Sequence, residues 1–257
     1  MSKVIVVTGA SSGIGAATGQ LLASKGHAVV LVARRKGALD TVGAECGGRA
    51  HVSVADVTRR DEVRRVVREA VDTFGRIDVW INNAGRGITR APSQLTDQDV
   101  DDMMTVNVKS ALYGVQEVLP HFISRGEGHI INISSMLGRM PLATMRSAYC
   151  GAKHFLNALT YTLRDELKQA HPTIAISLVS PGVVYTDFGN NAVHGGADSR
   201  QLPYGQTPED VASVIAGVVD SRAEDVYTRT GAREQVIKYF SEHGSDPEAG
   251  GADGGGR

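Results

Sequence analysis

The segment VIVVTGASSGIG, residues 4–15, decides the fold. Its first half is a run of β-branched residues, as expected of a strand that is buried on both faces of a parallel sheet. Its second half is a glycine-rich turn, and a helical pattern containing Leu21 and Leu22 follows it. This order of strand, turn and helix suits the pyrophosphate of a dinucleotide, because glycines let the backbone approach the phosphates and the helix start offers free N–H groups. The glycine spacing is GxxxGxG, which differs from the GxGxxG form.

The second predicted strand, residues 28–33, ends in Arg34, Arg35 and Lys36. In a dinucleotide-binding fold this strand end faces the adenosine ribose, where an acidic residue binds the 2′-hydroxyl of NAD and an arginine accommodates the 2′-phosphate of NADP. No carboxylate occurs until Asp40. The pattern therefore favours NADP(H) over NAD(H), with Arg34 as the main contact. The alternative is a solvated basic turn at the start of a helix.

Strand-like and helix-like segments alternate along the rest of the chain. Further strands are expected at residues 50–54, 78–82, 128–134, 173–179 and 225–228, and helices at 61–74, 96–125, 147–170, from 207 onward and at 234–240. This alternation predicts an α/β fold, namely a single-domain, Rossmann-like, doubly wound parallel sheet of about seven strands with helices on both faces. The domain is expected to span residues 1–243, and the polar, glycine-rich residues 244–257 are expected to form a disordered tail.

Polar and glycine residues follow several of these strands at their carboxyl ends. Asp56-Val57 follows the third strand, Asn82-Asn83-Ala84-Gly85 the fourth, and the segment 181–186 the sixth. Open α/β sheets bind ligands along this edge, so these residues are candidates for contacts with a cofactor. Asp56 is equally suited to capping the next helix, and the Asn-Gly segment to an ordinary loop.

Tyr149 and Lys153 are four residues apart in a segment whose apolar residues repeat at helical spacing, so their side chains should share one helix face. A nearby ammonium favours the tyrosinate and would lower the pKa of the phenol, which makes the pair a candidate general acid/base. Ser134-Ser135 ends the fifth strand, and a serine hydroxyl there could hold a carbonyl oxygen. Asn107 lies among apolar neighbours, where its amide needs a partner, and a purely structural role is the alternative.

This order of motifs resembles the short-chain dehydrogenase/reductase family over about residues 3–240. TGASSGIG (8–15) looks like the glycine motif of the family, and NNAG (82–85) looks like its fourth-strand motif. The catalytic residues that the resemblance implies are Asn107, Ser135, Tyr149 and Lys153. The candidate cofactor-binding residues, from the patterns and the resemblance together, are Gly9, Ser11, Ser12, Gly13, Ile14, Gly15, Arg34, Arg35, Asp56, Val57, Asn83, Ala84, Gly85, Tyr149, Lys153, Pro181, Gly182, Val184 and Thr186.

The resemblance also implies roles for these residues. Tyr149 would be the acid/base, Lys153 would assist it and bind the nicotinamide ribose, and Asn107 would hold a water that links the lysine to solvent. The family serine usually lies thirteen residues before the tyrosine, whereas Ser135 lies fourteen and Ser134 fifteen residues before it. A one-residue insertion within residues 138–147 accounts for the difference, and Ser135 is assigned with Ser134 left open.

Composition limits the partners that the protein can have. The 257 residues carry a net charge of -1, so neither nucleic acid nor an anionic membrane surface is expected as a partner. Cys46 and Cys150 form no disulfide framework and no metal-ligand spacing, and no metal site is expected. The chain shows neither a signal-peptide pattern nor an apolar run as long as a membrane span, so a cytoplasmic protein is expected. The family resemblance implies a homodimer or homotetramer that pairs the helices at 96–125 and 147–170.

The sequence therefore predicts an NADP(H)-dependent oxidoreductase that interconverts a small carbonyl compound, a ketone or an aldehyde, and the corresponding alcohol. The alternative is a regulatory or scaffold protein that binds the cofactor without turnover. A nucleotide-sugar epimerase is disfavoured, because the chain after the sixth strand is too short for an added substrate domain. Residues 187–203 are expected to form a substrate lid or to be locally disordered. The apolar residues expected to line the substrate site are Met136, Leu137, Met140, Met145, Val184, Tyr185 and Phe188, and the arginines that either meet an acidic substrate or face solvent are Arg86, Arg90, Arg139 and Arg146.

Overall fold

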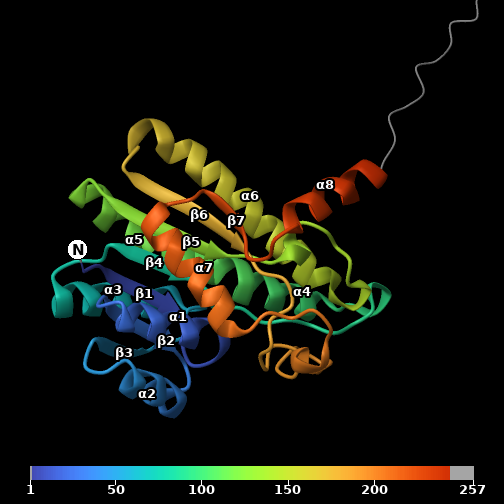
Figure 1. Cartoon of the computed structure of the whole chain (residues 1–257), viewed down its shortest axis with the longest axis horizontal. Coiled ribbons are helices and arrows are strands. Elements are labelled where there is room, and N and C mark those ends of the chain that lie inside the picture. Colours follow the sequence, from blue (N-terminus) through green and yellow to red (C-terminus); the bar gives the residue numbers. More distant parts are fainter. Residues whose placement is uncertain (1, 244–257) are drawn as a thin grey trace, which may run out of the picture.

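The computed structural model describes residues 2–243, which are built around a seven-stranded sheet (Figure 1). All neighbouring strands are parallel, and their spatial order is β3-β2-β1-β4-β5-β6-β7. The strands are β1 (Val4–Thr8), β2 (Ala28–Ala33), β3 (Ala50–Val54), β4 (Val79–Asn82), β5 (Gly128–Ile133), β6 (Ile174–Ser180) and β7 (Asp225–Tyr227). The predicted tail at residues 244–257 lies outside the described residues.

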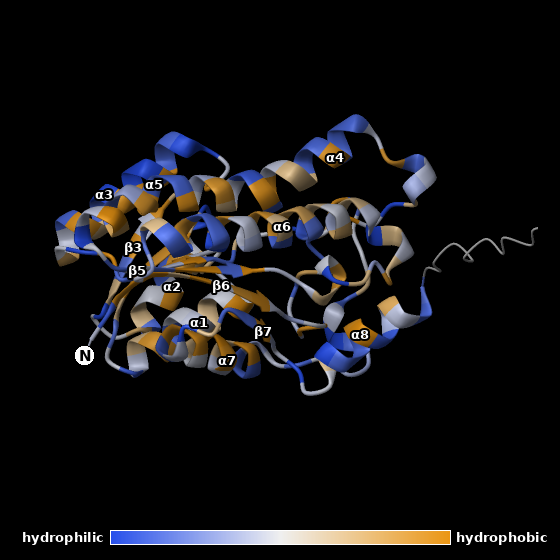
Figure 2. Ribbon diagram, turned by 90° about the horizontal axis from the view of Figure 1, so that it is seen from above, coloured by the Kyte–Doolittle hydropathy of each residue, from blue (hydrophilic) through white to orange (hydrophobic). Residues whose placement is uncertain are grey.

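Helices cover both faces of the sheet, so the predicted fold class is confirmed (Figure 2). One face carries α1, α2 and α7, and the other carries α3, α5 and α6. The helices are α1 (Gly13–Ser24), α2 (Lys36–Glu45), α3 (Arg60–Phe74), α4 (Asp97–Met104), α5 (Ser110–Arg125), α6 (Ser147–Ala170), α7 (Pro208–Ser221) and α8 (Ala232–Glu242). Short 3₁₀ turns lie at Pro92–Gln94, Met136–Gly138, Thr144–Arg146 and Ser199–Gln201.

The two-sided cover explains the uninterrupted apolar run of the first strand. Every residue of β1 is buried, and alternate side chains enter the two cores. Ile5 and Val7 pack with Leu22 and Ile215 of α1 and α7, whereas Val6 packs in the core under α3, α5 and α6. A half-exposed strand would alternate apolar with polar residues, so the continuous run is the sequence signature of a central parallel strand.

The long helix predicted over residues 96–125 contains an interruption. α4 and α5 are joined by a π-helical turn at Thr105–Lys109, in which the backbone N–H of Ser110 donates to the carbonyl of Thr105. A π turn carries one more residue than an α-helical turn, and such turns occur frequently at functional sites. Apolar periodicity does not reveal a single extra residue, so the sequence predicted one regular helix. Asn107 lies in the middle of this turn.

The strand order reverses between β1 and β4, which makes the carboxyl ends of these two strands the switch point of the sheet. Thr8 joins the two strand ends. Its Oγ1 accepts hydrogen bonds from the backbone N–H groups of Asn83 and Ala84, at 2.9 and 3.1 Å, and donates to the carbonyl of Ile81 at 3.1 Å. The glycine turn that follows Thr8 is thereby fixed against the segment that follows β4.

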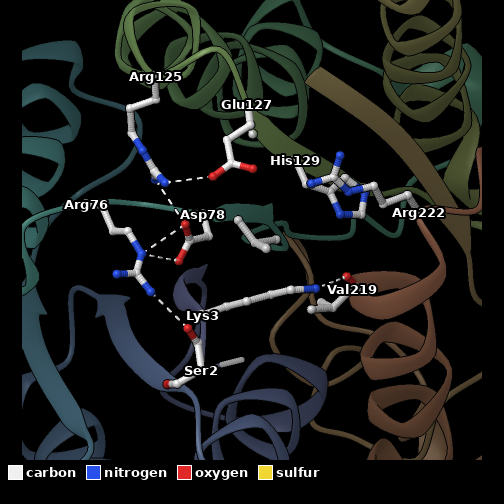
Figure 3. Close-up of a pocket in the computed structure, with 11 residues that line it drawn as sticks. Ser2, Lys3, Arg76, Asp78, Arg125, Glu127, His129, Val219 and Arg222 are labelled. Carbon is white, nitrogen blue, oxygen red and sulfur yellow. Dashed lines mark hydrogen bonds and ion pairs between the residues drawn. The ribbon is translucent and has the colours of Figure 1, made fainter. Parts of the chain in front are cut away.

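A charged cluster lies at the opposite edge, where the strands begin (Figure 3). Asp78 accepts hydrogen bonds from the N–H of Val4 at 2.7 Å and from the guanidinium groups of Arg76 and Arg125, at 2.9 and 3.0 Å. Burial acts to raise the pKa of Asp78, but these hydrogen bonds and charges lower it overall. The cluster borders a cavity of about 440 Å³ and fastens the start of β4 to the start of β1. Its groups pair with one another, so we assign it a structural role.

Candidate active site

The glycine turn after β1 requires glycine at specific positions. Gly9 and Gly13 have φ angles of +68° and +55°, in the left-handed region that favours glycine. A Cβ on Gly9 would lie 2.9 Å from the Cα of Ala84, and a Cβ on Gly15 would lie 2.4 Å from the carbonyl oxygen of Gly9. The spacing GxxxGxG is therefore explained by two left-handed residues and one close approach of the start of α1 to the turn.

The start of α1 has the properties of an anion site. Ser12 occupies the N-cap position, but its side chain makes no capping hydrogen bond to the first N–H groups of the helix. The hydroxyls of Ser11 and Ser12 instead accept hydrogen bonds from Nη2 of Arg35, at 3.1 and 2.9 Å. A Cβ on Gly13 would meet Cγ2 of Thr186 at 3.0 Å, so the segment after β6 borders the same turn. Uncapped N–H groups, a glycine surface and a guanidinium fit the phosphates of a dinucleotide.

Arg34 and Asp56 lie close together at the ends of β2 and β3. Nη1 of Arg34 is 3.9 Å from Oδ2 of Asp56, and the Arg34 side chain is 69% exposed. Oδ1 of Asp56 accepts hydrogen bonds from the N–H and the hydroxyl of Thr58, at 3.0 and 2.7 Å. Asp56 therefore stabilises the turn that precedes α3, while Val57 continues that turn and packs partly buried against the core under α3. Arg35, rather than the Arg34 predicted as the main contact, lies over the glycine turn.

Three of the predicted catalytic side chains meet at the carboxyl end of β5. Tyr149 and Lys153 lie on α6 and are only 6% and 4% exposed. Nζ of Lys153 donates to the carbonyl of Ile133 at 2.9 Å and lies 5.8 Å from the centroid of the Tyr149 ring. The side chain of Ser135 lies near enough to the Tyr149 phenol to act on it, since it lowers the pKa of that group against the effect of burial. The helix spacing predicted from the sequence thus brings the tyrosine and the lysine to the end of the strand that carries the serine.

Ser134 and Ser135 have different surroundings. Oγ of Ser134 donates to Oδ1 of Asn157 at 2.5 Å, and Nδ2 of Asn157 donates to the carbonyl of Gly138 at 2.6 Å. Asn157 therefore holds the segment that carries Ser135 against α6, one helical turn after Lys153. Sequence reasoning missed Asn157, although an amide on the buried face of an amphipathic helix is a signal that could have indicated it.

The expectation that the pKa of Tyr149 lies below its ordinary value is wrong for the protein by itself. Burial raises the pKa of Tyr149 to about 12, and the hydrogen bond from Ser135 and the charge of Arg146 oppose this rise only in part. Burial also lowers the pKa of Lys153 to about 8. Both side chains are buried, and burial disfavours the charged form of each. At pH 7 the tyrosine therefore carries its proton, which is the state that a general acid needs.

Asn107 is 1% exposed, and the backbone around it satisfies its amide. Its Oδ1 accepts from the N–H of Arg86 at 3.2 Å, and its Nδ2 donates to the carbonyls of Arg86 and Met103, at 3.0 and 3.1 Å. A Cβ on Gly85 would lie 2.9 Å from Oδ1 of Asn107 and 3.7 Å from Nζ of Lys153. The π turn thus brings Asn107 to the lysine and ties it to the segment after Gly85.

The segment after β6 completes this edge of the sheet. The carbonyl of Pro181 accepts a hydrogen bond from the N–H of Met136 at 2.8 Å, which joins the segment to the residue after Ser135. Val184 is buried and packs in the same core as Ile14 of the glycine turn. Gly182 lies between Pro181 and Val184 in the chain, next to the side chain of Arg229. The predicted residues at 181–186 are therefore adjacent to both the glycine turn and the serine.

Residues 187–203 are ordered and pack onto the segment that follows Gly85. Val193 donates to the carbonyl of Gly87 at 2.9 Å and accepts from the N–H of Thr89 at 3.0 Å. Nε2 of His194 lies 2.7 Å from Oδ1 of Asp99 at the start of α4. The ring of Phe188 meets the ring of Tyr149 edge to face, with centroids 5.5 Å apart. Of the two predicted alternatives, the structure has an ordered segment that covers the tyrosine.

The apolar residues predicted to line a substrate site have mixed positions. Leu137 and Phe188 pack in a small core cluster with Tyr149, whereas Met140 is buried and Met145 is 45% exposed. The hydroxyl of Tyr185 accepts from the N–H of Gly205, so this side chain supports the chain after the 187–203 segment. Within residues 2–243, no helix is long and apolar enough to cross a membrane, and no group of three His, Cys, Asp or Glu side chains could hold a metal ion.

Comparison with known proteins agrees with this geometry. The sequence profile described as short chain dehydrogenase matches residues 3–196. The chain belongs to the short-chain dehydrogenase family. The uncharacterized oxidoreductase YxnA of Bacillus subtilis is similar to this chain, with 32% identity over an alignment of 268 residues that covers 95% of this chain and 75% of YxnA.

Solved structures of the short-chain dehydrogenase family superimpose closely on this one. A member from Burkholderia phymatum in complex with NAD has a TM-score of 0.85 and covers 96% of this chain and 97% of its own, and its 24% identity shows a shared fold alone. A serine dehydrogenase in complex with NADP+ is 28% identical, with a TM-score of 0.80 and coverage of 87% and 93%. The protein is thus an oxidoreductase of the short-chain dehydrogenase family, and these two solved structures similar to it hold NAD or NADP.

Proposed function

We propose that this short-chain dehydrogenase is an NADP(H)-dependent carbonyl reductase, which also runs in reverse as an alcohol dehydrogenase. The observation that carries the proposal is the buried Tyr149 with Ser135 acting on its phenol and with Nζ of Lys153 5.8 Å from its ring centroid. These residues lie at the same sheet edge as the glycine turn. This combination supports proton transfer to a carbonyl oxygen beside a bound dinucleotide.

When bound, a reduced nicotinamide supplies a hydride to the carbonyl carbon. Tyr149 is protonated at neutral pH and donates its proton to the carbonyl oxygen, while the hydroxyl of Ser135 donates a hydrogen bond to the same oxygen. Lys153, which is charged below its pKa of about 8, stabilises the negative charge that remains on the tyrosine. Asn107 supports this proton transfer by holding the backbone beside Lys153.

The preference for NADP(H) rests on the cations at the end of β2. Arg35 contacts the two serines of the glycine turn, and Arg34 is solvent-exposed beside it. Fluorescence titrations with NADPH and with NADH test this preference, and we expect much tighter NADPH binding that Arg35→Asp and Arg34→Asp each weaken about tenfold or more. Lys36→Met is the matched control, because Lys36 pairs with Asp40 at 2.7 Å and should not contribute. Equal or tighter NADH binding would contradict the preference.

Turnover is tested with a panel of aldehydes and ketones and NADPH as the reductant. Tyr149→Phe should lower kcat by roughly 10²–10⁴-fold, the range that one general acid contributes, with NADPH affinity nearly unchanged. Tyr239→Phe, on α8, is the control. Near-normal turnover by Tyr149→Phe would contradict the assignment, and NADPH binding without turnover of any carbonyl by the wild type would favour the regulatory alternative.

The proposed homodimer or homotetramer pairs α4 and α5 with α6. Each of these helices carries an exposed apolar side chain, namely Val100, Ile123 and Phe155, at 44%, 40% and 49% exposure. A second copy of the chain would cover these side chains. A light-scattering mass equal to one chain would contradict the proposal. The cytoplasmic location stays a prediction.

A further inference from the structure

Arg146 directly precedes α6 and lies three residues before Tyr149 in the chain. Its Cζ is 5.8 Å from the centroid of the Phe188 ring, and that ring packs on Tyr149. The cation also acts on the phenol, since its charge opposes the rise that burial causes in the pKa of Tyr149. A half-buried guanidinium therefore lies near the proposed proton donor, with the ring of Phe188 next to both.

Arg146 differs from the other three arginines near the site in its partners. Arg90 pairs with Asp99 at 2.8 Å, Arg139 forms an ion pair with Asp225, and Arg86 donates to a backbone carbonyl of the 187–203 segment. Among residues 2–243, the guanidinium of Arg146 makes neither an ion pair nor a hydrogen bond. A partly desolvated cation without a partner is unfavourable, and an anion bound beside it would remove that cost.

Two hydroxyl groups near Arg146 also lack partners within the described part of the chain. Oγ1 of Thr89 and Oγ of Ser147 are buried and unpaired. Oγ1 of Thr89 and Nη2 of Arg146 lie 2.9 and 3.5 Å from one point, the position that a Cβ on Gly196 would take, and the carbonyl oxygen of Gly189 lies 2.7 Å from it. Ser147 directly follows Arg146. A guanidinium beside two free hydroxyl donors is a suitable donor set for a carboxylate.

Small residues make room for this guanidinium. A Cβ on Gly87 would lie 2.7 Å from Nη1 of Arg146 and 2.9 Å from the Phe188 ring. Gly87 also pairs with the backbone of Val193, so any larger residue would push the 187–203 segment away from Tyr149. The position of Arg146 therefore depends on glycine at residue 87, in the segment after β4, and at residue 196, within the 187–203 segment.

We propose that Arg146, with the hydroxyls of Thr89 and Ser147, binds the carboxylate of the substrate, which is a small 2- or 3-oxo acid that is reduced to the corresponding hydroxy acid. The proposal rests on the proposed carbonyl-reductase function. The reduced nicotinamide dinucleotide gives a hydride to the oxo carbon, the π pair of that carbonyl takes the proton of Tyr149, and the carboxylate is unchanged. The short chain length follows from Phe188, because its ring centroid lies 5.8 Å from Cζ of Arg146 and 5.5 Å from the Tyr149 ring, so the cation and the phenol lie on either side of one side chain.

The test compares each acid with its own methyl ester, which has the same carbonyl group and no charge. Pyruvate and acetoacetate, with their methyl esters, are reduced with NADPH by the wild type, by Arg146→Met and by Arg146→Lys. We expect the wild type to have a higher kcat/KM for the acids than for their esters. Arg146→Met should lower kcat/KM for the acids about 10- to 100-fold, mainly by raising KM, so that the kcat/KM values for acid and ester become nearly equal. Arg146→Lys should be intermediate, because it keeps the charge and loses the planar fork.

Arg200→Met is the matched control. Arg200 belongs to the 187–203 segment, but Asp187 and Asp198 neutralise it at 2.9 and 2.8 Å, so its loss should not change the ratio of acid to ester. If Arg146 only holds Phe188 in place, Arg146→Met will lower kcat/KM for acids and esters by the same factor, and the carboxylate site is refuted. Equal rates with acid and ester in the wild type would also refute it, although the reductase function would stand.

A binding measurement separates this proposal from the proposed function. Calorimetric titration of the NADP+-saturated protein with lactate or 3-hydroxybutyrate requires no turnover. Binding that Arg146→Met abolishes supports the carboxylate site even if no carbonyl is reduced. No binding of either acid to the wild type overturns the site.

Discussion

Lys153 is a buried ammonium, and replacing it with methionine should change stability in a way that depends on pH. Burial lowers its pKa from the ordinary 10.5 to about 8. At about 1.4 kcal/mol per pKa unit, this shift means that the charged lysine destabilises the folded protein by about 3 kcal/mol at pH 7 relative to an uncharged one. Lys153→Met removes this cost but leaves the carbonyl of Ile133 without its donor, a loss of about 1–3 kcal/mol.

The sign of the pH dependence follows from proton binding. Between pH 8 and pH 10.5 the unfolded chain keeps a proton on Lys153 that the folded protein has released, so stability rises with pH in this window. From pH 7 to pH 9.5 the wild type should gain about 2 kcal/mol that Lys153→Met does not gain. This difference is independent of the packing changes that the substitution itself causes.

Urea unfolding of both proteins at pH 7 and pH 9.5 measures the effect. Other titrating groups, including the thiols of Cys46 and Cys150, are present in both proteins and cancel in the comparison. A wild type and a variant with parallel pH dependence would show that the ammonium of Lys153 is solvated. That result would also remove the basis for assigning the low lysine pKa to burial.

Three further predictions concern stability and turnover. Asp78→Asn should lower the free energy of unfolding by about 1.5–3 kcal/mol at pH 7, as measured by urea unfolding. Because the pKa of Asp78 is lower in the folded protein than in the unfolded chain, the wild type should have this stabilisation above pH 3.8 and lose it as the pH falls further. Gly128→Ala should lower the free energy of unfolding by about 1–3 kcal/mol, since its Cβ would lie 2.1 Å from the Phe122 ring. Gly151→Ala on α6 has open space and should raise the free energy of unfolding by about 0.5–1 kcal/mol. Equal melting temperatures for the two variants would contradict this reasoning. In the wild type, reduction should slow above about pH 8 as Lys153 loses its charge, and a flat pH–rate profile from pH 6 to 10 would speak against its proposed role.

Much of the fold could be predicted because it depends on local patterns. The β-branched run at residues 4–8 and the glycines after it fixed the first strand and turn, and the four-residue spacing placed Tyr149 and Lys153 on one helix face. The alternation of strands and helices was sufficient for the parallel sheet. These features could be predicted because each is encoded within a window of a few residues.

Other features depend on contacts between distant segments and could not be read from such windows. The π turn around Asn107 differs from a regular helix by a single residue, and the choice between Arg34 and Arg35 depends on how the turn after β2 meets Ser12. The opposite pKa shifts of the tyrosine and lysine arise from burial, which is a property of the whole domain. The helical pattern could have indicated that Asn157 is buried, but not its partners, which lie about twenty residues away in the chain.

The strand order has a consequence for how the chain folds as it is synthesised. β1, β2 and β3 pair with their neighbours in sequence, as do β4, β5, β6 and β7, and the two groups meet only through the pairing of β1 with β4. That pairing joins residues more than seventy positions apart, and the entropy lost on closing this long loop opposes it until its contacts form. The first three strands can therefore pair on a nascent chain, but the pairing of β1 with β4 cannot form until β4 has been synthesised. The glycine turn is therefore synthesised well before the segment after β4, against which it is held in the folded protein.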